Sequence, residues 1–152
     1  IGYESGKPLR ITIPNGLPIF NGQLRPNLVG GVEPFLNNDS SAFRPLNQLS
    51  GDRGDVMLNQ AAFATPAAYT FGNLAPFVAQ LRSFGAISQD FTLAKRFQTG
   101  ESHFVEVRTD WFNAFNRRNL NAPNTDLTSV NFGRITGQAP ARVIQIGARF
   151  AF

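Results

Sequence analysis

The C-terminal residues, 142–152, alternate between apolar side chains and polar or small ones, and this pattern constrains the fold more than any other feature. One set of alternate positions carries Ile144, Ile146, Ala148, Phe150 and Phe152, and the other carries Gln145, Gly147, Arg149 and Ala151. Successive side chains of a β-strand point to opposite faces, so a period of two indicates a strand. About ten such residues, apolar on one face, are typical of a strand that crosses a membrane within a barrel.

Two further segments, 85–97 and 103–116, alternate in the same way and are separated by a short turn that contains Gly100. Residues 5–13 alternate briefly and are expected to end another strand. The sequence therefore predicts an all-β fold of about four antiparallel amphipathic strands, over 5–13, 85–97, 103–116 and 142–152.

Charged and apolar side chains divide between the two faces of these strands. A charge at the middle of a bilayer costs about 2–4 kcal/mol, so a charged face must point at a watery lumen. Lys95 interrupts the apolar face near its end, where its amine could reach a headgroup layer. We expect lumen-facing charges at Asp90, Arg96, Glu106, Arg108, Asp110 and Arg149. We expect lipid- or partner-facing side chains at Phe91, Leu93, Val105, Val107, Trp111, Ile144 and Ile146.

Long connections occupy residues 14–84 and 117–141. The first is rich in turn residues, among them Asn15–Gly16, Asn21–Gly22 and Gly30–Gly31, and is expected to be one very long loop. Within it, 73–82 could form a short helix and 56–63 a short strand or turn. Barrels place short turns on the periplasmic side and long loops outside. Long and short connections alternate along this chain as the rule requires, which predicts a single barrel segment over 1–152.

Composition excludes several classes of protein. The chain lacks cysteine and has one histidine, which excludes disulfides, thiolate metal sites and multi-histidine metal centres within one chain. A net charge of +4 without a run of basic residues indicates no nucleic-acid partner. The charge-free stretch 56–81 contains Pro66 and Pro76, which argues against a membrane-spanning helix. Only 16 % of the residues are charged, and the chain contains 15 Phe residues. This composition suits an outer-membrane barrel or another extracellular β-protein.

Several motifs match known catalytic or binding patterns, but each has a simpler explanation. His103 has no Ser or Cys partner at a catalytic spacing, and the alternating charges on 106–110 fit a lumen better than an acid–base group. Arg53–Gly54–Asp55 matches a cell-adhesion tripeptide that often occurs by chance. Residues 37–39 and 52–55 could bind calcium through oxygen ligands, but turn formation explains them better. Residues 38–40 form a glycosylation sequon, which is meaningful only in a secretory host. We expect no catalytic, cofactor-binding or metal-binding residues, and no enzyme.

An ordered set of motifs resembles a known family. Residues 3–8 resemble its "SG-x-P" strand, 25–30 its "RPNLVG" loop, and 59–66 its "N-x-A-A-F-x-x-P" segment. Residues 91–97, 111–116, 132–136 and 142–152 are similar to its later strands and to its "FG-x-I-T" element. The family is that of TonB-dependent outer-membrane receptors, in particular the C-terminal end of the Oar-like, carboxypeptidase-regulatory-like members of acidobacterial type.

The resemblance implies how the last strand is used. Gln145, Gly147, Phe150 and Phe152 fit the barrel-insertion signal of outer-membrane proteins, so the insertion machinery is an expected partner. Such receptors have about 22 strands and a plug, and about eight strands are needed to enclose a lumen. Four strands leave open edges, which pair with available strands. We expect copies of the chain to pair through these edges into a multi-chain barrel or tube that does not transport by itself.

Three alternatives remain. The chain could form an extracellular self-assembling filament or tube outside the membrane, be a fragment of a full-length receptor, or be a soluble enzyme or binding domain. These alternatives differ in what covers the apolar face. Lipid or detergent is expected for a protein of the outer membrane, and protein is expected for a filament at the cell surface or outside the cell.

Overall fold

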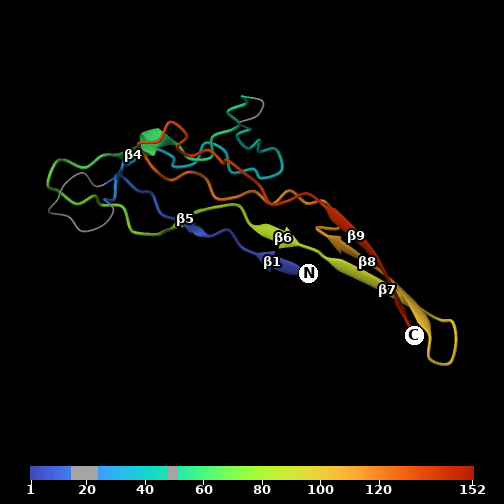
Figure 1. Ribbon diagram of the computed structural model, residues 1–152. Helices are drawn as coiled ribbons and strands as arrows, with labels where there is room; N and C mark the ends of the chain where they lie inside the picture. Colours follow the sequence, from blue (N-terminus) through green and yellow to red (C-terminus); the bar gives the residue numbers. More distant parts are fainter. Residues whose placement is uncertain (15–23, 48–50) are drawn as a thin grey trace. The chain divides into compact units, whose positions relative to one another are not determined.

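The computed structural model describes residues 1–14, 24–47 and 51–152 (Figure 1). The described residues form short antiparallel strands and one 3-10 turn, η1 (Gln60–Ala62), and no α-helix. Among them there is no helix with the length and hydrophobicity needed to cross a membrane. The all-β class with open, unclosed sheets, predicted from the alternating segments, is confirmed.

The chain forms two compact units. Unit 1 contains Ile1–Glu4, Ala86–Asn119 and Ala139–Phe152, and unit 2 contains Ser5–Gly85 and Leu120–Gln138. The alternating strands lie mainly in unit 1, whereas unit 2 is built largely from the two long connections. The division arises because unit 2 has a hydrophobic core of its own.

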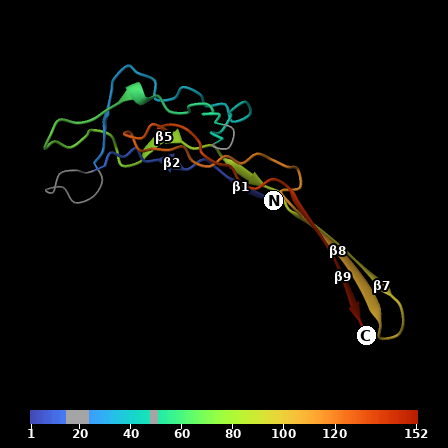
Figure 2. The same cartoon turned by 45° about the horizontal axis from the view of Figure 1, so that its top comes forward.

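Unit 1 is built around a three-stranded antiparallel sheet in the order β7 (Phe91–Gln98), β8 (Phe104–Phe112) and β9 (Val143–Ala151) (Figure 2). The β7–β8 turn is closed by a hydrogen bond from Thr99 N to the His103 carbonyl oxygen, 3.0 Å. A smaller pair joins β1 (Gly2–Glu4) to β6 (Ala86–Ser88), also antiparallel. The sheet therefore occupies the part of the chain with the clearest period of two.

The predicted strands are longer than the observed ones. The strand expected over 103–116 ends at Phe112, because Asn113 and Asn116 adopt left-handed backbone conformations with φ of 49° and 51°. The strand expected over 85–97 is interrupted between β6 and β7, where the Asp90 carboxylate accepts a hydrogen bond from Asn113 N, 2.8 Å. Of the strand expected over 5–13, the structure contains β2 (Pro8–Leu9) and single bridges at Thr12 and Ile13.

Unit 2 contains the remaining strand pairs. β2 pairs with β5 (Val78–Arg82), and β3 (Asn27–Leu28) pairs with β4 (Phe63–Ala64). The helix considered for 73–82 is therefore wrong. Pro76 disfavours a helix there, and the extended chain of β5 buries Leu81 in the core. Residues 56–63 combine single bridges at Val56 and Leu58 with the turn η1.

A hydrophobic core runs through the segments that the sequence predicts to be loops. Fully buried side chains include Ile11, Phe43, Met57, Leu58, Leu81 and Ile135. In its described residues, the long loop predicted over 14–84 contains β3, β4, β5 and η1 as well as core side chains. Its apolar residues are scattered between turns, so they have neither helical nor strand periodicity. The Asn15–Gly16 and Asn21–Gly22 turns lie outside the described residues.

Candidate functional site

The β7–β8–β9 register places one set of apolar side chains on the same side of the sheet, because directly paired residues of antiparallel strands share a face. We call this surface the apolar face. Several of its members are strongly exposed, with Ile146 at 78 % and Leu93 at 62 %, whereas Val105, Thr109 and Trp111 are half-buried. Its four rows across the sheet are Phe91, Trp111 and Ile144; Leu93, Thr109 and Ile146; Lys95, Val107 and Ala148; and Phe97, Val105 and Phe150. All seven residues predicted to face lipid or a partner lie in these rows.

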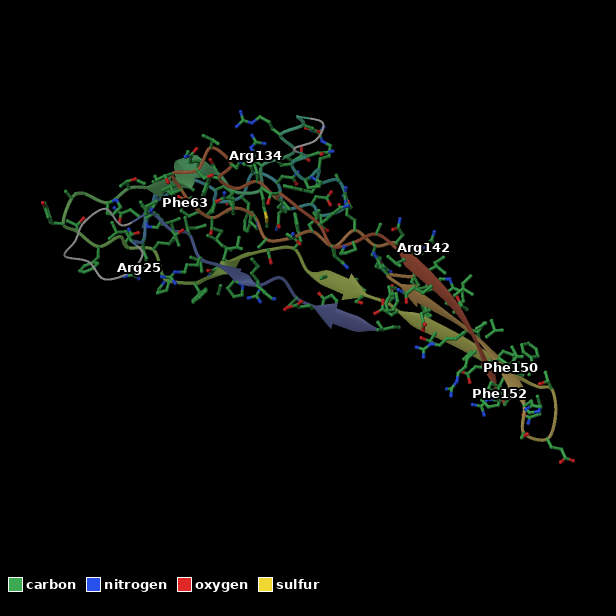
Figure 3. All side chains as sticks on the ribbon, in the orientation of Figure 1. Arg25, Phe63, Arg134, Arg142, Phe150 and Phe152 are labelled. Carbon is green, nitrogen blue, oxygen red and sulfur yellow. The ribbon has the colours of Figure 1, made fainter. Side chains whose placement is uncertain are left out.

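Aromatic rings lie at both ends of the apolar face, with aliphatic side chains between them. Phe91 and Trp111 occupy the first row, and Phe97 and Phe150 occupy the last. Figure 3 shows Arg142 beside the start of β9, and Phe150 and Phe152 towards its other end. Two aromatic girdles around an apolar band are characteristic of barrels that cross the outer membrane.

The strands have the length that a membrane crossing requires. β8 and β9 each contain 9 residues. At about 3.3 Å per residue, such strands are about 30 Å long, and membrane-spanning strands use about 9–11 residues at a tilt near 45°. The strands are therefore long enough to cross the apolar layer with the tilt usual in barrels.

Two polar residues interrupt the apolar face. Lys95 pairs with Val107 in the third row, about 7 Å from the last aromatic row. Its flexible stem can carry the amine that distance to a headgroup layer. Thr109 lies between Leu93 and Ile146, and its hydroxyl is buried without a hydrogen-bond partner among the described residues.

The opposite surface, which we call the charged face, carries linked charges. Arg96 pairs with Glu106 across the β7–β8 pair at 3.3 Å, and Arg108 pairs with Asp110 along β8 at 2.9 Å. The Thr92 hydroxyl donates to Asp110 Oδ1 at 2.6 Å. These contacts pair opposite charges on one polar surface, and the interior of outer-membrane barrels is polar.

Of the two remaining predicted lumen charges, Arg149 lies on the charged face and Asp90 does not. Arg149 lies opposite Glu106 in the β8–β9 register and so shares the charged face. Asp90 lies outside the three-stranded sheet, at the break before β7, where Ser88 Oγ and Asn113 N both donate to its carboxylate. Its role in the structure is to hold the chain at this break.

The four residues of the predicted insertion signal divide between the two faces and the end of β9. Gln145 lies opposite Asp110 and Gly147 lies opposite Arg108 on the charged face. Phe150 is on the apolar face, and its ring centroid is 6.0 Å from that of Phe152, which follows the strand.

The loop motifs are held by local hydrogen bonds. Both carboxylate oxygens of Asp55 are bound by Arg44: the backbone N–H donates to Oδ2 at 2.8 Å and Nη2 donates to Oδ1 at 3.0 Å. These bonds lower the pKa of Asp55 below its usual value. Asp39 accepts hydrogen bonds from the Ser41 hydroxyl and backbone, which lowers its pKa as well. The described ranges contain no cluster of three or more metal-ligating His, Cys, Asp or Glu residues.

An aromatic cavity at the first row was not predicted from the sequence. It has a volume of about 470 Å³, and Trp111, Phe91, Phe115 and Arg142 are among its lining residues. Phe115 belongs to the quoted segment 111–116, but the turn that brings it against Phe91 depends on the left-handed Asn113. No sequence pattern linked Arg142 to Trp111, because the pairing of β8 with β9 brings them together.

One of three comparisons with known proteins gives a match. The comparison with curated proteins found no match, and the comparison with solved structures found none. Residues 1–145 match the family model described as an outer membrane beta barrel domain. The match covers nearly the whole chain and implies a location in the outer membrane. The chain therefore belongs to the outer-membrane β-barrel domain family.

Proposed function

We propose that the chain is a structural segment of an outer-membrane barrel of the TonB-dependent transporter type, which pairs through its strand edges with further copies and does not transport by itself. The observation that carries this proposal is the exposed apolar face, bordered by aromatic rings, on a sheet with two unpaired edges. Lipid or detergent would cover the apolar face.

The unpaired edges make the segment incomplete. Within the described residues, β7 and β9 each pair only with β8 in the three-stranded sheet. Their outward backbone N–H and C=O groups have no ladder partner. In lipid, each unsatisfied backbone group costs several kcal/mol, so only closed barrels and helices span membranes. Other strands must therefore cover both edges.

Strand direction supports completion by identical copies. β7 and β9 run in the same direction because each is antiparallel to β8. β6 and β7 follow one another along one line (Figure 1), and β1 runs antiparallel to β6. With β1 counted as a fourth segment, the segments of one copy alternate in direction, so β9 of one copy can pair antiparallel with β1 of the next and give the even strand number usual in bacterial barrels. Because β1 has three residues and lies beside β6, the edge of β7 needs a further strand.

Several of the motifs on which the proposed resemblance to TonB-dependent receptors rests meet in unit 2. Asn73 N donates to Asn27 Oδ1 at 2.9 Å and Leu28 N donates to Asn73 Oδ1 at 2.7 Å, which fixes the "RPNLVG" segment. Asn59 accepts a hydrogen bond from Ala61 N and begins η1. Gly133 of the "FG-x-I-T" segment lies directly against Leu58. Segments distant in sequence thus form one folded unit.

Light scattering with size-exclusion chromatography, with and without detergent, tests the assembly. We expect particles in detergent that contain several chains of 16.6 kDa and aggregation without detergent. Monodisperse particles of one chain in detergent-free buffer would refute both membrane insertion and self-assembly. Single-chain particles in detergent would favour a fragment that needs other strands of a receptor.

A pair of single-cysteine variants identifies what covers each face, since the chain contains no cysteine. Ile146→Cys carries an environment-sensitive dye on the apolar face, and Gly147→Cys carries it on the charged face, where a Cβ meets open space. We expect a blue shift in detergent at position 146 alone. A blue shift at 146 without detergent, in particles of many chains, would indicate a protein tube outside the membrane.

A further inference from the structure

The cavity at the first row of the apolar face combines aromatic walls with one cation. The rings of Phe91 and Phe115 meet edge to face with centroids 5.7 Å apart. Trp111 and Leu93 extend the apolar wall, and Arg142 lies at the cavity as well. The volume of about 470 Å³ is within the range of small-molecule sites.

The backbone of Arg142 is held in place by a hydrogen bond, and most N–H donors of its guanidinium are available for a ligand. Its backbone N–H donates to Asn116 Oδ1 at 3.0 Å, which fixes the residue just before β9. Among the described residues, its guanidinium makes one long hydrogen bond, from Nη1 to the Ala114 carbonyl oxygen at 3.4 Å. A guanidinium has five N–H donors, so most of them are available to an anion.

We propose that this cavity binds a phosphate-bearing lipid, with its phosphate on Arg142 and the first part of an acyl chain across Trp111, Phe91 and Leu93. The inference rests on the proposed function, in which the apolar face meets lipid. Arginine binds phosphate through two parallel hydrogen bonds, and aromatic rings favour the depth at which headgroups meet acyl chains. The cavity offers both at the end of an apolar band.

The surroundings favour a lipid over a free anion. Phe91, Leu93 and Trp111 belong to the apolar face, so the cavity wall continues into the surface that an acyl chain would cover. Inorganic phosphate would leave these rings exposed to water. Asp and Glu are absent from the cavity lining, so no carboxylate there would repel the phosphate.

Tryptophan fluorescence measures this binding directly, because Trp111 is the sole tryptophan of the chain and lines the cavity. The assembled protein in detergent micelles is titrated with phospholipids brominated on the acyl chain, which quench a tryptophan at close range. We expect the anionic brominated phosphatidylglycerol to half-quench Trp111 at about a fivefold lower mole fraction than the zwitterionic brominated phosphatidylcholine, as one arginine near a headgroup allows.

Two arginine variants separate the site from general charge. Arg142→Gln should bring the two lipids to equal quenching, whereas Arg149→Gln, which changes a cation near the other end of β9 on the charged face, should leave the difference intact. The inference is overturned if Arg142→Gln keeps the difference or if both variants lose it equally. Millimolar inorganic phosphate should leave the quenching unchanged, and full displacement by it would indicate a free-anion site.

The same titration distinguishes failure of this inference from failure of the proposed function. If neither lipid quenches Trp111 and the dye at position 146 stays in a watery environment, the apolar face does not meet lipid and the proposed function fails. If the dye reports an apolar environment while the two lipids quench Trp111 equally, the membrane role stands and the lipid site is refuted.

Discussion

Two threonines of the same sheet show that the surroundings of a hydroxyl group decide whether it stabilises the fold. Thr92 donates to the Asp110 carboxylate at 2.6 Å on the charged face. Thr109 lies on the apolar face, and its hydroxyl is buried with no partner in the described part of the chain. A hydrogen bond to a charged group stabilises a fold, while a buried unpaired hydroxyl destabilises it.

Replacement of each threonine by valine tests this difference, because valine keeps the β-branched shape. Thr109→Val should raise the free energy of unfolding by about 1 kcal/mol, and Thr92→Val should lower it by about 1 kcal/mol. Urea unfolding in detergent micelles, followed by circular dichroism, measures both changes. A loss of stability in Thr109→Val would show that its hydroxyl is satisfied.

Gly133 has a conformation and a surrounding that exclude a side chain. Its φ is +72°, and an added Cβ would lie 2.7 Å from the Leu58 carbonyl oxygen. Gly133→Ala should therefore destabilise unit 2 by more than the roughly 1 kcal/mol that a left-handed residue costs. Gly147→Ala is the matched control, since its Cβ would meet open space. Equal unfolding midpoints of the two variants would contradict this account.

Among the elements, the loop from Arg44 to Asp55 is closed by a small set of polar contacts. Asp55 N donates to the Arg44 carbonyl oxygen at 2.8 Å, and Arg44 binds the Asp55 carboxylate in return. Arg134 Nη1 donates to the carbonyl oxygens of Arg53 and Gly54, each at 2.7 Å. The Asp55 carboxylate thus accepts a hydrogen bond from the Arg44 backbone and forms an ion pair with the Arg44 side chain.

The lowered pKa of Asp55 gives this loop a defined pH dependence. A carboxyl whose folded pKa is lower than its unfolded value of 3.8 stabilises the folded loop at all pH values above the unfolded pKa, and this contribution is lost as the pH falls through the folded pKa. Proteolysis of the loop should stay constant from neutral pH to about pH 5 and rise below about pH 4. An acid-stable protease such as pepsin, with mass spectrometry of the fragments, measures the acidic part.

Asp55→Asn is the control for this titration. The amide keeps the shape of the side chain without a charge that titrates, so cleavage of the variant should be faster at neutral pH and should change little on acidification. If wild type and variant respond equally to acid, another group controls opening of the loop.

The elements differ in how far the sequence reveals them. The three-stranded sheet follows from alternation alone, because each of its strands has one apolar and one polar face. Unit 2 could not be predicted, since residues such as Phe43 and Ile135, both buried, are far apart in sequence and follow no period. The ends of the strands were also missed, because they depend on left-handed asparagines and on Asp90. Prediction of the cavity at the first row would have required the β8–β9 register, which no local sequence pattern contains.

At the scale of the whole molecule, the two units place their apolar side chains in opposite ways. Unit 2 buries Ile11 to 1 % exposure in a core of its own, whereas unit 1 leaves Ile146 at 78 %. The burial of apolar surface stabilises a fold in water by about 25 cal/mol per Å², and the sheet obtains this contribution only when lipid, detergent or another chain covers it. Unit 2 should therefore keep its structure without detergent under conditions in which the β7–β8–β9 sheet does not.

Two isoleucine-to-alanine variants test this difference in one experiment. Ile11→Ala should lower the stability of unit 2 by about 2–5 kcal/mol in water and in detergent alike, because a buried side chain leaves a cavity. Ile146→Ala should have little effect in water and should weaken the sheet in detergent. Hydrogen exchange with mass spectrometry resolves the two effects, since peptides from β5 report on unit 2 and peptides from β9 report on the sheet. The contrary outcome is that Ile11→Ala reduces the protection of β9 as much as that of β5. This result would show that the two units unfold together. The sheet would then be stabilised by the unit 2 core rather than by its covered apolar face.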